Sequence, residues 1–344
     1  MNDKLLHNLK KTIASTNVNF LIGSGLSRPF LDVLQNIETQ LTQAENDGDE
    51  AKILVLKEEY FTKCMKGNLE VVDESENTTK NKVLQNYKDF YKSINYLLLK
   101  REDSILTKQV NVFTTNVDVF SEKALEETGI EFNDGFSGRF SPRYNIGNFK
   151  KSYFKKSLHY ENTSEVPIFN ILKLHGSLSW KKDTDGVVLD QDLQLLREVE
   201  SDVASNYDRL MIVNPTKKKF EDTVLNQYYY DLLRVYSNEL EKENSVLFVM
   251  GFSFADEHIR DLTMQVMGSN PTLMVYIISH GSSPNPTYDE MKEKARNKNI
   301  EVLYPPDGEK YNLKTVTEKV FEKIYSDEEG IVPESDEASN VSFL

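Results

Sequence analysis

Residues 19–27 read Asn-Phe-Leu-Ile-Gly-Ser-Gly-Leu-Ser, an apolar run that ends in a glycine-rich turn. Residues 110–118 repeat this scheme, because the run Val-Asn-Val-Phe-Thr leads into a second polar turn. A third apolar run, residues 169–175, ends at His175 just before a glycine. Runs without polar alternation predict strands that are covered on both faces. In an open α/β sheet, ligands bind outside the carboxyl ends of the strands, where these three turns are expected to meet.

Seven short runs rich in Val, Ile, Phe and Leu predict strands, and helical patterns over residues 223–242 and 255–267 separate several of them. The predicted strands are residues 19–23, 110–115, 169–175, 209–213, 246–251, 273–279 and 300–304. The alternation predicts an α/β fold with a doubly wound, mainly parallel, Rossmann-like sheet that carries a helical insertion.

The main domain is predicted to comprise residues 1–34 and 109–325. Between its first two strands, residues 35–108 have a helical pattern and are predicted to form an insertion or cap. Within the main domain, residues 135–166 form a basic, aromatic, loop-rich segment, which we interpret as a lid, since loops of this length usually bind something. Residues 326–344 carry six acids and no Lys or Arg, a composition typical of a disordered tail.

The chain has 344 residues, of which 39% are hydrophobic, and a net charge of −14, which is typical of a soluble globular protein and disfavours direct nucleic-acid binding. Its N-terminus predicts an amphipathic helix without the features of a secretory signal, and no apolar run is long enough to span a membrane. The single cysteine, Cys64, excludes an internal disulfide and a multi-cysteine zinc site, so we expect no metal. These features predict a cytoplasmic protein.

The turn after the first predicted strand contains Gly23, Ser24, Gly25 and Ser27. Glycines let the backbone approach a phosphate, serines add hydroxyl donors, and a following helix would offer N–H groups. The third glycine of the dinucleotide fingerprint is absent, because Arg28 stands in its place. A plain strand-to-helix turn is therefore an equally good interpretation of this motif.

Asn116 and Asp118 follow the second predicted strand, and His175 follows the third. Asn116 is able to hold a ribose hydroxyl or orient a water, whereas the alternative for this pair is a helix N-cap. His175 is the best candidate for a general base among five histidines, with Gly176 leaving its imidazole uncrowded. Its alternative is a structural histidine.

A late strand leads into a turn that contains Gly251, Ser253 and Asp256. Gly251 and Ser253 are candidates to touch a nucleotide from the far side of the crevice. Ser253 or Asp256 is alternatively a simple cap of the next helix. The strand exit at residues 214–216 contains a proline and is a further candidate for the pocket wall.

The motifs GSGLS, TTNVD, LHGS and VMGFSFAD, in this order, resemble the NAD-binding core of sirtuins over residues 19–279, and most closely the sirtuin-like proteins of bacterial antiphage defence. The resemblance implies that Asn116 and His175 are the catalytic pair and that residues 23–27 hold the diphosphate of NAD+. It also implies that Asp118 supports the nicotinamide side of the NAD+ pocket. Thr115 stands where the family's Thr-Gln-Asn motif has Gln. Gly251 and Ser253 then meet the adenosine half.

Several motifs of protein-deacylating sirtuins are absent: the two zinc-binding Cys pairs, the Gly-Ile-Pro-Asp-Phe-Arg loop and the Phe-Gly-Glu segment. These departures favour cleavage of NAD+ by water, with NAD+ as the substrate and no metal. A sensor that binds NAD+ or ADP-ribose without cutting it is the first alternative, and a protein deacylase is the second. A nucleic-acid module, suggested by Lys150, Lys151, Lys155 and Lys156, is the third.

An enzyme that depletes NAD+ needs a switch, and the chain contains no recognisable sensor domain. Control by assembly is therefore expected, with a homo-oligomer as the simplest form. The resemblance implies a HerA-type hexameric ATPase as partner and an antiphage effector role. The helical insertion and the acidic tail are the candidate docking surfaces.

Overall fold

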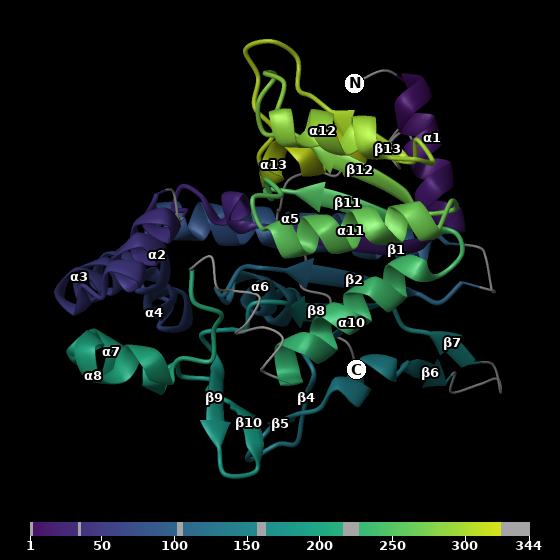
Figure 1. Cartoon of the computed structure of the whole chain (residues 1–344). Coiled ribbons are helices and arrows are strands. Elements are labelled where there is room, and N and C mark those ends of the chain that lie inside the picture. Colours follow the sequence, from purple (N-terminus) through teal and green to yellow (C-terminus); the bar gives the residue numbers. More distant parts are fainter. Residues whose placement is uncertain (1–2, 34–35, 102–105, 157–162, 216–226, 325–344) are drawn as a thin grey trace.

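The structure is a computed structural model that describes residues 3–33, 36–101, 106–156, 163–215 and 227–324. Its centre is a seven-stranded sheet of order β13-β12-β11-β1-β2-β8-β3, in which all the pairings are parallel (Figure 1). Its strands are β1 (Asn17–Ile22), β2 (Gln109–Thr114), β3 (Phe132–Asn133), β8 (Ile168–Lys173), β11 (Ser245–Met250), β12 (Met274–Ile278) and β13 (Ile300–Leu303). The predicted fold class is confirmed.

Helices cover both faces of this sheet (Figure 1). Alternate strand residues belong to the two separate core clusters, one on each face. One layer consists of α1 (Asp3–Ser15), α5 (Thr78–Leu99), α6 (Phe120–Thr128) and α13 (Leu313–Val316), which runs into η5 (Thr317–Phe321). The opposite layer consists of α10 (Gln227–Glu241), α11 (Glu257–Ser269) and α12 (Pro286–Lys294). The amphipathic helix predicted at the N-terminus is therefore present as α1.

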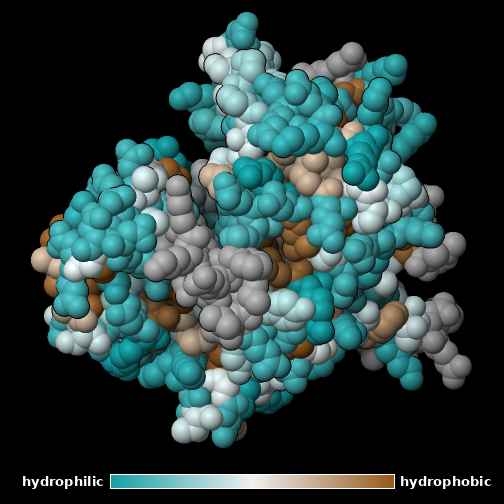
Figure 2. Space-filling view, in the orientation of Figure 1, coloured by the Kyte–Doolittle hydropathy of each residue, from teal (hydrophilic) through white to brown (hydrophobic). Residues whose placement is uncertain are grey.

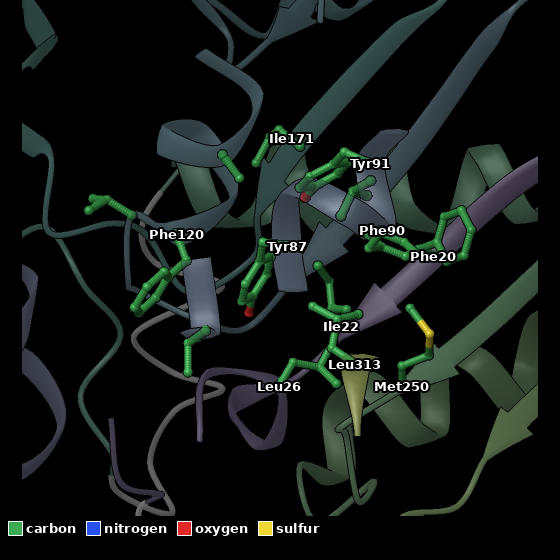
Figure 3. Packing of buried hydrophobic residues seen from close by; sticks show 14 of the residues in the cluster. Phe20, Ile22, Leu26, Tyr87, Phe90, Tyr91, Phe120, Ile171, Met250 and Leu313 are labelled. Atoms are coloured by element: carbon green, nitrogen blue, oxygen red, sulfur yellow. The ribbon is translucent and has the colours of Figure 1, made fainter. Parts of the chain in front are cut away.

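Aromatic rings fill the core between α5 and the sheet (Figure 3). The Phe20 ring on β1 lies edge-on to Phe90 of α5 at 5.2 Å between centroids and stacks on Phe248 of β11 at 5.4 Å. All three side chains are fully buried. Burying a phenylalanine stabilises a fold by about 1.5–3 kcal/mol, so α5 is part of the main core although it lies in the segment predicted as an insertion.

Three asparagines on neighbouring strands fix the register of the sheet. Asn19, Asn111 and Asn170 are direct partners on β1, β2 and β8. Each later amide donates to the preceding amide oxygen at 2.9 Å, and Asn111 also donates to Glu239 of α10 at 2.9 Å. A slip by one residue would turn these amides into the opposite apolar layer. The carboxyl ends of the strands are thereby held level.

Residues 36–73, which precede α5, form a helical projection beside the sheet (left in Figure 1). It contains α2 (Ile37–Asp47), α3 (Glu50–Tyr60), the π-helix η2 (Phe61–Met65) and α4 (Gly67–Val72). Next to it lie α7 (Gln194–Ser201), α8 (Val203–Asn206) and η4 (Tyr207–Arg209). Ion pairs join the two groups, for example Lys57–Asp208 at 2.6 Å. The division into a main domain and an insertion stays a prediction.

Two small antiparallel sheets complete the described fold. One has the order β4 (Phe136–Ser137), β5 (Arg143–Tyr144), β10 (Gly186–Leu189), β9 (Trp180–Asp183). The other pairs β6 (Phe154–Lys156) with β7 (Thr163–Glu165), and η3 (Ile146–Lys150) lies between the two in sequence. These elements include the described part of residues 135–166. The acidic tail, 326–344, lies outside the described residues.

One predicted strand, residues 209–213, is wrong. This segment forms no strand of a sheet, and Ile212 makes only an isolated bridge with Gly176. Its backbone bonds go to the turn after β8, because Ser177 donates to the Met211 carbonyl and Val213 donates to the His175 carbonyl. The two-residue strand β3 was missed because it is too short to show a pattern.

The face of the molecule in Figure 2 is mostly hydrophilic, with apolar residues exposed in small areas. Within the described ranges, no helix is both long enough and apolar enough to cross a membrane.

Candidate active site

A cavity of about 420 Å³ lies where the turns after β1, β2, β8 and β11 meet. This volume is in the range of small-molecule sites. Nine of the ten predicted site residues line it: Ser24, Gly25, Ser27, Thr115, Asn116, Asp118, His175, Gly251 and Ser253. The tenth, Gly23, does not line the cavity but packs against the lining residue Gly251. The structure therefore brings the predicted residues together, whereas their roles are still predictions.

The two glycine turns are packed backbone against backbone. A Cβ on Gly23 would lie 2.4 Å from the Gly251 carbonyl oxygen, and one on Gly251 (φ 64°) would lie 2.7 Å from Leu26. The Gly23 and Gly25 N–H groups donate to the Met250 and Gly251 carbonyls at 3.0 and 3.1 Å. These glycines are therefore required for the close packing of the two turns, whether or not a phosphate binds there. The expected helix after Gly25 is only the four-residue 3₁₀ turn η1 (Ser24–Ser27).

Asn116 lines the cavity and has a buried amide oxygen without a hydrogen-bond partner among the described residues. Its backbone N–H donates to the Thr114 hydroxyl at 3.0 Å, and that hydroxyl donates to the Ile22 carbonyl at 2.9 Å. The turn after β2 is therefore tied to β1. Asn116 is 6% exposed, and its Oδ1 has no hydrogen-bond partner among the described residues. A buried acceptor of this kind costs free energy unless a ligand or water donates to it.

Beneath Asn116 lies a buried polar cluster of Ser27, Tyr87 and Asp118. The Ser27 hydroxyl donates to Asp118 Oδ2 at 2.7 Å and lies 3.0 Å from the Tyr87 hydroxyl. Burial, and then the Asp118 carboxylate, raise the pKa of Tyr87 well above its ordinary value, so its phenol stays protonated. Asp118 Oδ1 also accepts from the Phe120 N–H at the start of α6. Asp118 thus ties down the chain just before α6, whose N-cap is Val119, and lines the cavity as well.

Lys173, at the end of β8, fixes the turn that contains Asp118 through contacts with its backbone and with α6. Its side chain is 2% exposed, lies 3.0 Å from Glu122 Oε1 of α6 and donates to the Asp118 carbonyl. Burial raises the pKa of Glu122, and the Lys173 charge opposes that rise. Sequence reasoning missed this lysine, although a charged residue inside an apolar run was a signal for a buried partner.

His175 lines the cavity and contacts Asp256. His175 Nε2 lies 3.1 Å from Asp256 Oδ2, and the two side chains are 14% and 7% exposed. The adjacent Gly176 has a φ of 76°, and a Cβ there would lie 2.0 Å from the Met211 carbonyl oxygen. The glycine is therefore required by the neighbouring backbone, not by the imidazole as predicted.

Residues after η1 and in the helical projection form a wall that sequence reasoning did not assign. They are Leu31, Asp32, Val33, Glu38, Tyr60 and Cys64. Cys64 lies on the π-helix η2, and burial raises the pKa of its thiol to about 12, so it stays protonated. Among the described residues, no three His, Cys, Asp or Glu side chains are grouped so that they could hold a metal ion.

Other predictions for this region had mixed outcomes. Pro215 of the predicted strand exit lines the cavity, beside Val213, whereas Thr216 lies outside the described residues. None of the described residues in 135–166 lines the cavity, so a role of that segment as a lid stays a prediction. Asp256, considered only as a helix cap, lines the cavity as well as capping α11.

Comparisons with known proteins are consistent with this arrangement. A family model described as SIR2-like domain matches residues 110–303, which is more than half of the chain and includes Asn116, His175 and Asp256. Among solved structures, 82 chains match. One of them, described as "Structure of Sir2Tm bound to a propionylated peptide", is 14% identical with a TM-score of 0.48, and the match covers 94% of this chain and 98% of that chain. No curated protein matches.

Proposed function

Because the chain belongs to the SIR2-like domain family, we propose that it is an NAD+ hydrolase, which cleaves NAD+ with water to nicotinamide and ADP-ribose. SIR2-like domains use NAD+. The observation that carries the proposal is the buried Asn116 Oδ1, which has no partner among the described residues and belongs to a side chain that lines the same cavity as His175. A ribose hydroxyl or a water satisfies this acceptor.

In the proposed reaction, the bond between nicotinamide and ribose breaks and nicotinamide leaves with the bonding electron pair. The water oxygen bonds to the ribose carbon, and the proton of that water passes to His175. Asn116 holds the ribose and the attacking water in position. The transition state resembles an oxocarbenium ion, so the carboxylate of Asp118 in the wall stabilises the positive charge that develops.

The rest of NAD+ is assigned to the two glycine turns. The N–H groups of Gly23 and Gly25 already donate to backbone carbonyls, so the Ser24 hydroxyl and the Ser27 region are the proposed contacts of the diphosphate. Gly251 and Ser253 meet the adenosine half from the opposite side. Thr115 lies on the ribose side next to Asn116.

The test measures NAD+ consumption by the full chain, with nicotinamide and ADP-ribose quantified. Asn116→Ala and His175→Ala are expected to lower turnover at least about 100-fold, the scale of a general base or a positioned water. His7→Ala and Asn8→Ala, on the exposed face of α1, are the matched controls. Normal turnover in Asn116→Ala contradicts the assignment.

The same assay separates the rival functions. Binding of NAD+ without release of nicotinamide, in every state of assembly tested, indicates a sensor. Release of nicotinamide only when an acyl-lysine peptide is present indicates a protein deacylase. Neither outcome is expected, because the chain has Asn214-Pro215-Thr216 where deacylating sirtuins have their peptide-binding segment.

We further propose that this activity is an antiphage effector that depletes NAD+ and is switched on by assembly, as a homo-oligomer and with a HerA-type hexameric ATPase. The sequence resemblance to defence proteins supports this role. Co-expression of the chain with such an ATPase, followed by size-exclusion chromatography and the NAD+ assay, tests it. Co-elution with raised turnover is expected, whereas separate elution with unchanged turnover contradicts control by this partner.

A further inference from the structure

The strongest contact in the cavity that the proposed reaction leaves unused is the one between His175 and Asp256. The two residues come from different strand ends, since His175 follows β8 and Asp256 precedes α11. Nε2 and Oδ2 are 3.1 Å apart, within ion-pair distance, and both side chains are largely buried. A buried carboxylate beside an imidazole fixes which ring nitrogen carries the proton.

The other carboxylate oxygen of Asp256 is held by a helix. Oδ1 accepts from the N–H groups of His258 and Ile259 at 3.1 and 3.4 Å, which makes Asp256 the N-cap of α11. The positive end of the helix dipole favours the ionised form. One oxygen therefore anchors the carboxylate while the second meets the imidazole, so the group is unable to rotate without losing its cap.

The backbone that leads to Asp256 is also held in an uncommon conformation. Gly251 has a φ of 64°, and Phe254, which is not a glycine, has a φ of 56°. Such a conformation is strained for a residue other than glycine and persists only where its surroundings hold it. The Phe254 ring is fully buried and packs on Phe252 at 5.1 Å, and the Tyr288 hydroxyl donates to the Phe252 carbonyl at 2.9 Å. The turn is thus fixed with Asp256 directed at His175.

We propose that Asp256 is the positioning residue of His175 in the NAD+ reaction, and this inference rests on the proposed function. In the reacting enzyme, Asp256 Oδ2 accepts a hydrogen bond from Nε2–H, which leaves the lone pair on Nδ1 of the neutral ring. Nδ1 is then the atom that takes the proton from water. The imidazolium that results is stabilised by the carboxylate, which stays ionised throughout.

The decisive substitutions are Asp256→Asn and Asp256→Ser, because Asn and Ser are both good N-caps and preserve the start of α11. Each is expected to lower kcat for NAD+ cleavage about 100-fold and to leave KM within about threefold, since the group acts through the base and not on bound substrate. Asp202→Asn is the matched control, because Asp202 caps α8 by accepting from Ser205. It is expected to leave kcat and KM unchanged.

A second readout needs no turnover. In protein labelled with ¹⁵N-histidine, NMR correlation spectra report the tautomer of each neutral imidazole, and the His175 signals are those lost in His175→Gln. The Nε2–H tautomer is expected in the unaltered protein, and Asp256→Asn is expected to lose this preference. A merely structural cap would change neither the tautomer nor the ratio of kcat to KM.

The outcomes separate this inference from the proposed function. An Nδ1–H tautomer in the unaltered protein, or an Asp256→Asn variant with kcat within about twofold of normal, overturns the positioning role. A protein that never cleaves NAD+ overturns the proposed function. The tautomer of His175 still shows whether Asp256 accepts a hydrogen bond from its Nε2–H. If Asp256→Asn fails to fold, Asp256→Ser and the tautomer of the unaltered protein decide whether the positioning role holds.

Discussion

Replacing Lys173 by Met tests how the Asn116–Asp118 turn is held. Lys173 lies 3.0 Å from Glu122 Oε1 with 2% of its side chain exposed. At this distance, and with an effective dielectric constant of about 20, the gross attraction is about 5–6 kcal/mol, much of which offsets the desolvation of both groups. Removing one partner of a buried pair costs about 3–5 kcal/mol. Because Glu122 is 18% exposed, we expect about 3 kcal/mol, which lowers Tm by about 4 °C in a chain of this length.

The loss is expected to depend on pH. Burial raises the pKa of Glu122, and Met removes the lysine charge that opposes this rise, so the pKa increases further in the variant. A group with a raised folded-state pKa stabilises the fold below its unfolded pKa and loses this contribution as pH rises through the folded value. The difference in Tm between the two proteins is therefore smaller at about pH 5 than at about pH 8.

Thermal unfolding at the two pH values measures both effects. Lys123→Met is the control, because Lys123 pairs with the well-exposed Glu74 and with the partly exposed Glu127, and its loss is expected to cost about 1 kcal/mol or less. The double variant Lys173→Met/Glu122→Gln is expected to recover about 2 kcal/mol, since no unpaired charge remains. A loss below about 1 kcal/mol in Lys173→Met, or one that is equal at both pH values, would refute the reasoning.

Two further substitutions probe the packing next to the cavity, at Gly23 and Tyr87, which contact lining residues. Gly23→Ala places a methyl 2.4 Å from the Gly251 carbonyl oxygen, so we expect loss of NAD+ turnover and a lower Tm. The control is Gly268→Ala on α11, whose methyl meets nothing within 4 Å and should raise stability by up to about 1 kcal/mol. A Gly23→Ala protein with unchanged turnover and Tm would show that the two turns do not pack as described. Tyr87→Phe removes the hydroxyl that lies 3.0 Å from the Ser27 hydroxyl, so we expect about 1 kcal/mol of destabilisation and reduced turnover. Denaturant unfolding and the NAD+ assay measure the two effects. Unchanged values in both would exclude a role for this hydroxyl.

The sequence was sufficient for the frame of the fold. Six of the seven predicted strands exist, because buried parallel strands leave apolar runs whose ends are marked by polar residues or glycine. The failure at residues 209–213 has a local cause, since an apolar run predicts burial but not which backbone accepts its hydrogen bonds. In this chain the turn at Gly176 provides them.

The site was predictable to the extent that its residues follow strand ends. Asn116 and His175 meet in one cavity because parallel strands place their carboxyl ends at one edge. Asp256, by contrast, has the sequence signature of an ordinary N-cap, and its second contact depends on a backbone bend at Phe254 that leaves no pattern. The wall from Leu31 to Cys64 was missed because no strand end marks it.

The position of β1 in the sheet has a consequence for synthesis. It is the first strand made, yet its neighbours β11 and β2 lie on either side of it, and β11 begins at Ser245. At about 5–20 residues per second, roughly 10–50 s separate the emergence of the Gly23 turn from that of the Gly251 turn against which it packs. A nascent chain, or a product truncated before β11, therefore lacks the cavity wall that Gly251, Phe252, Ser253, Ala255 and Asp256 supply. The cavity is complete only after the residues up to Asp256, in the last third of the chain, have been made and β11 has joined β1.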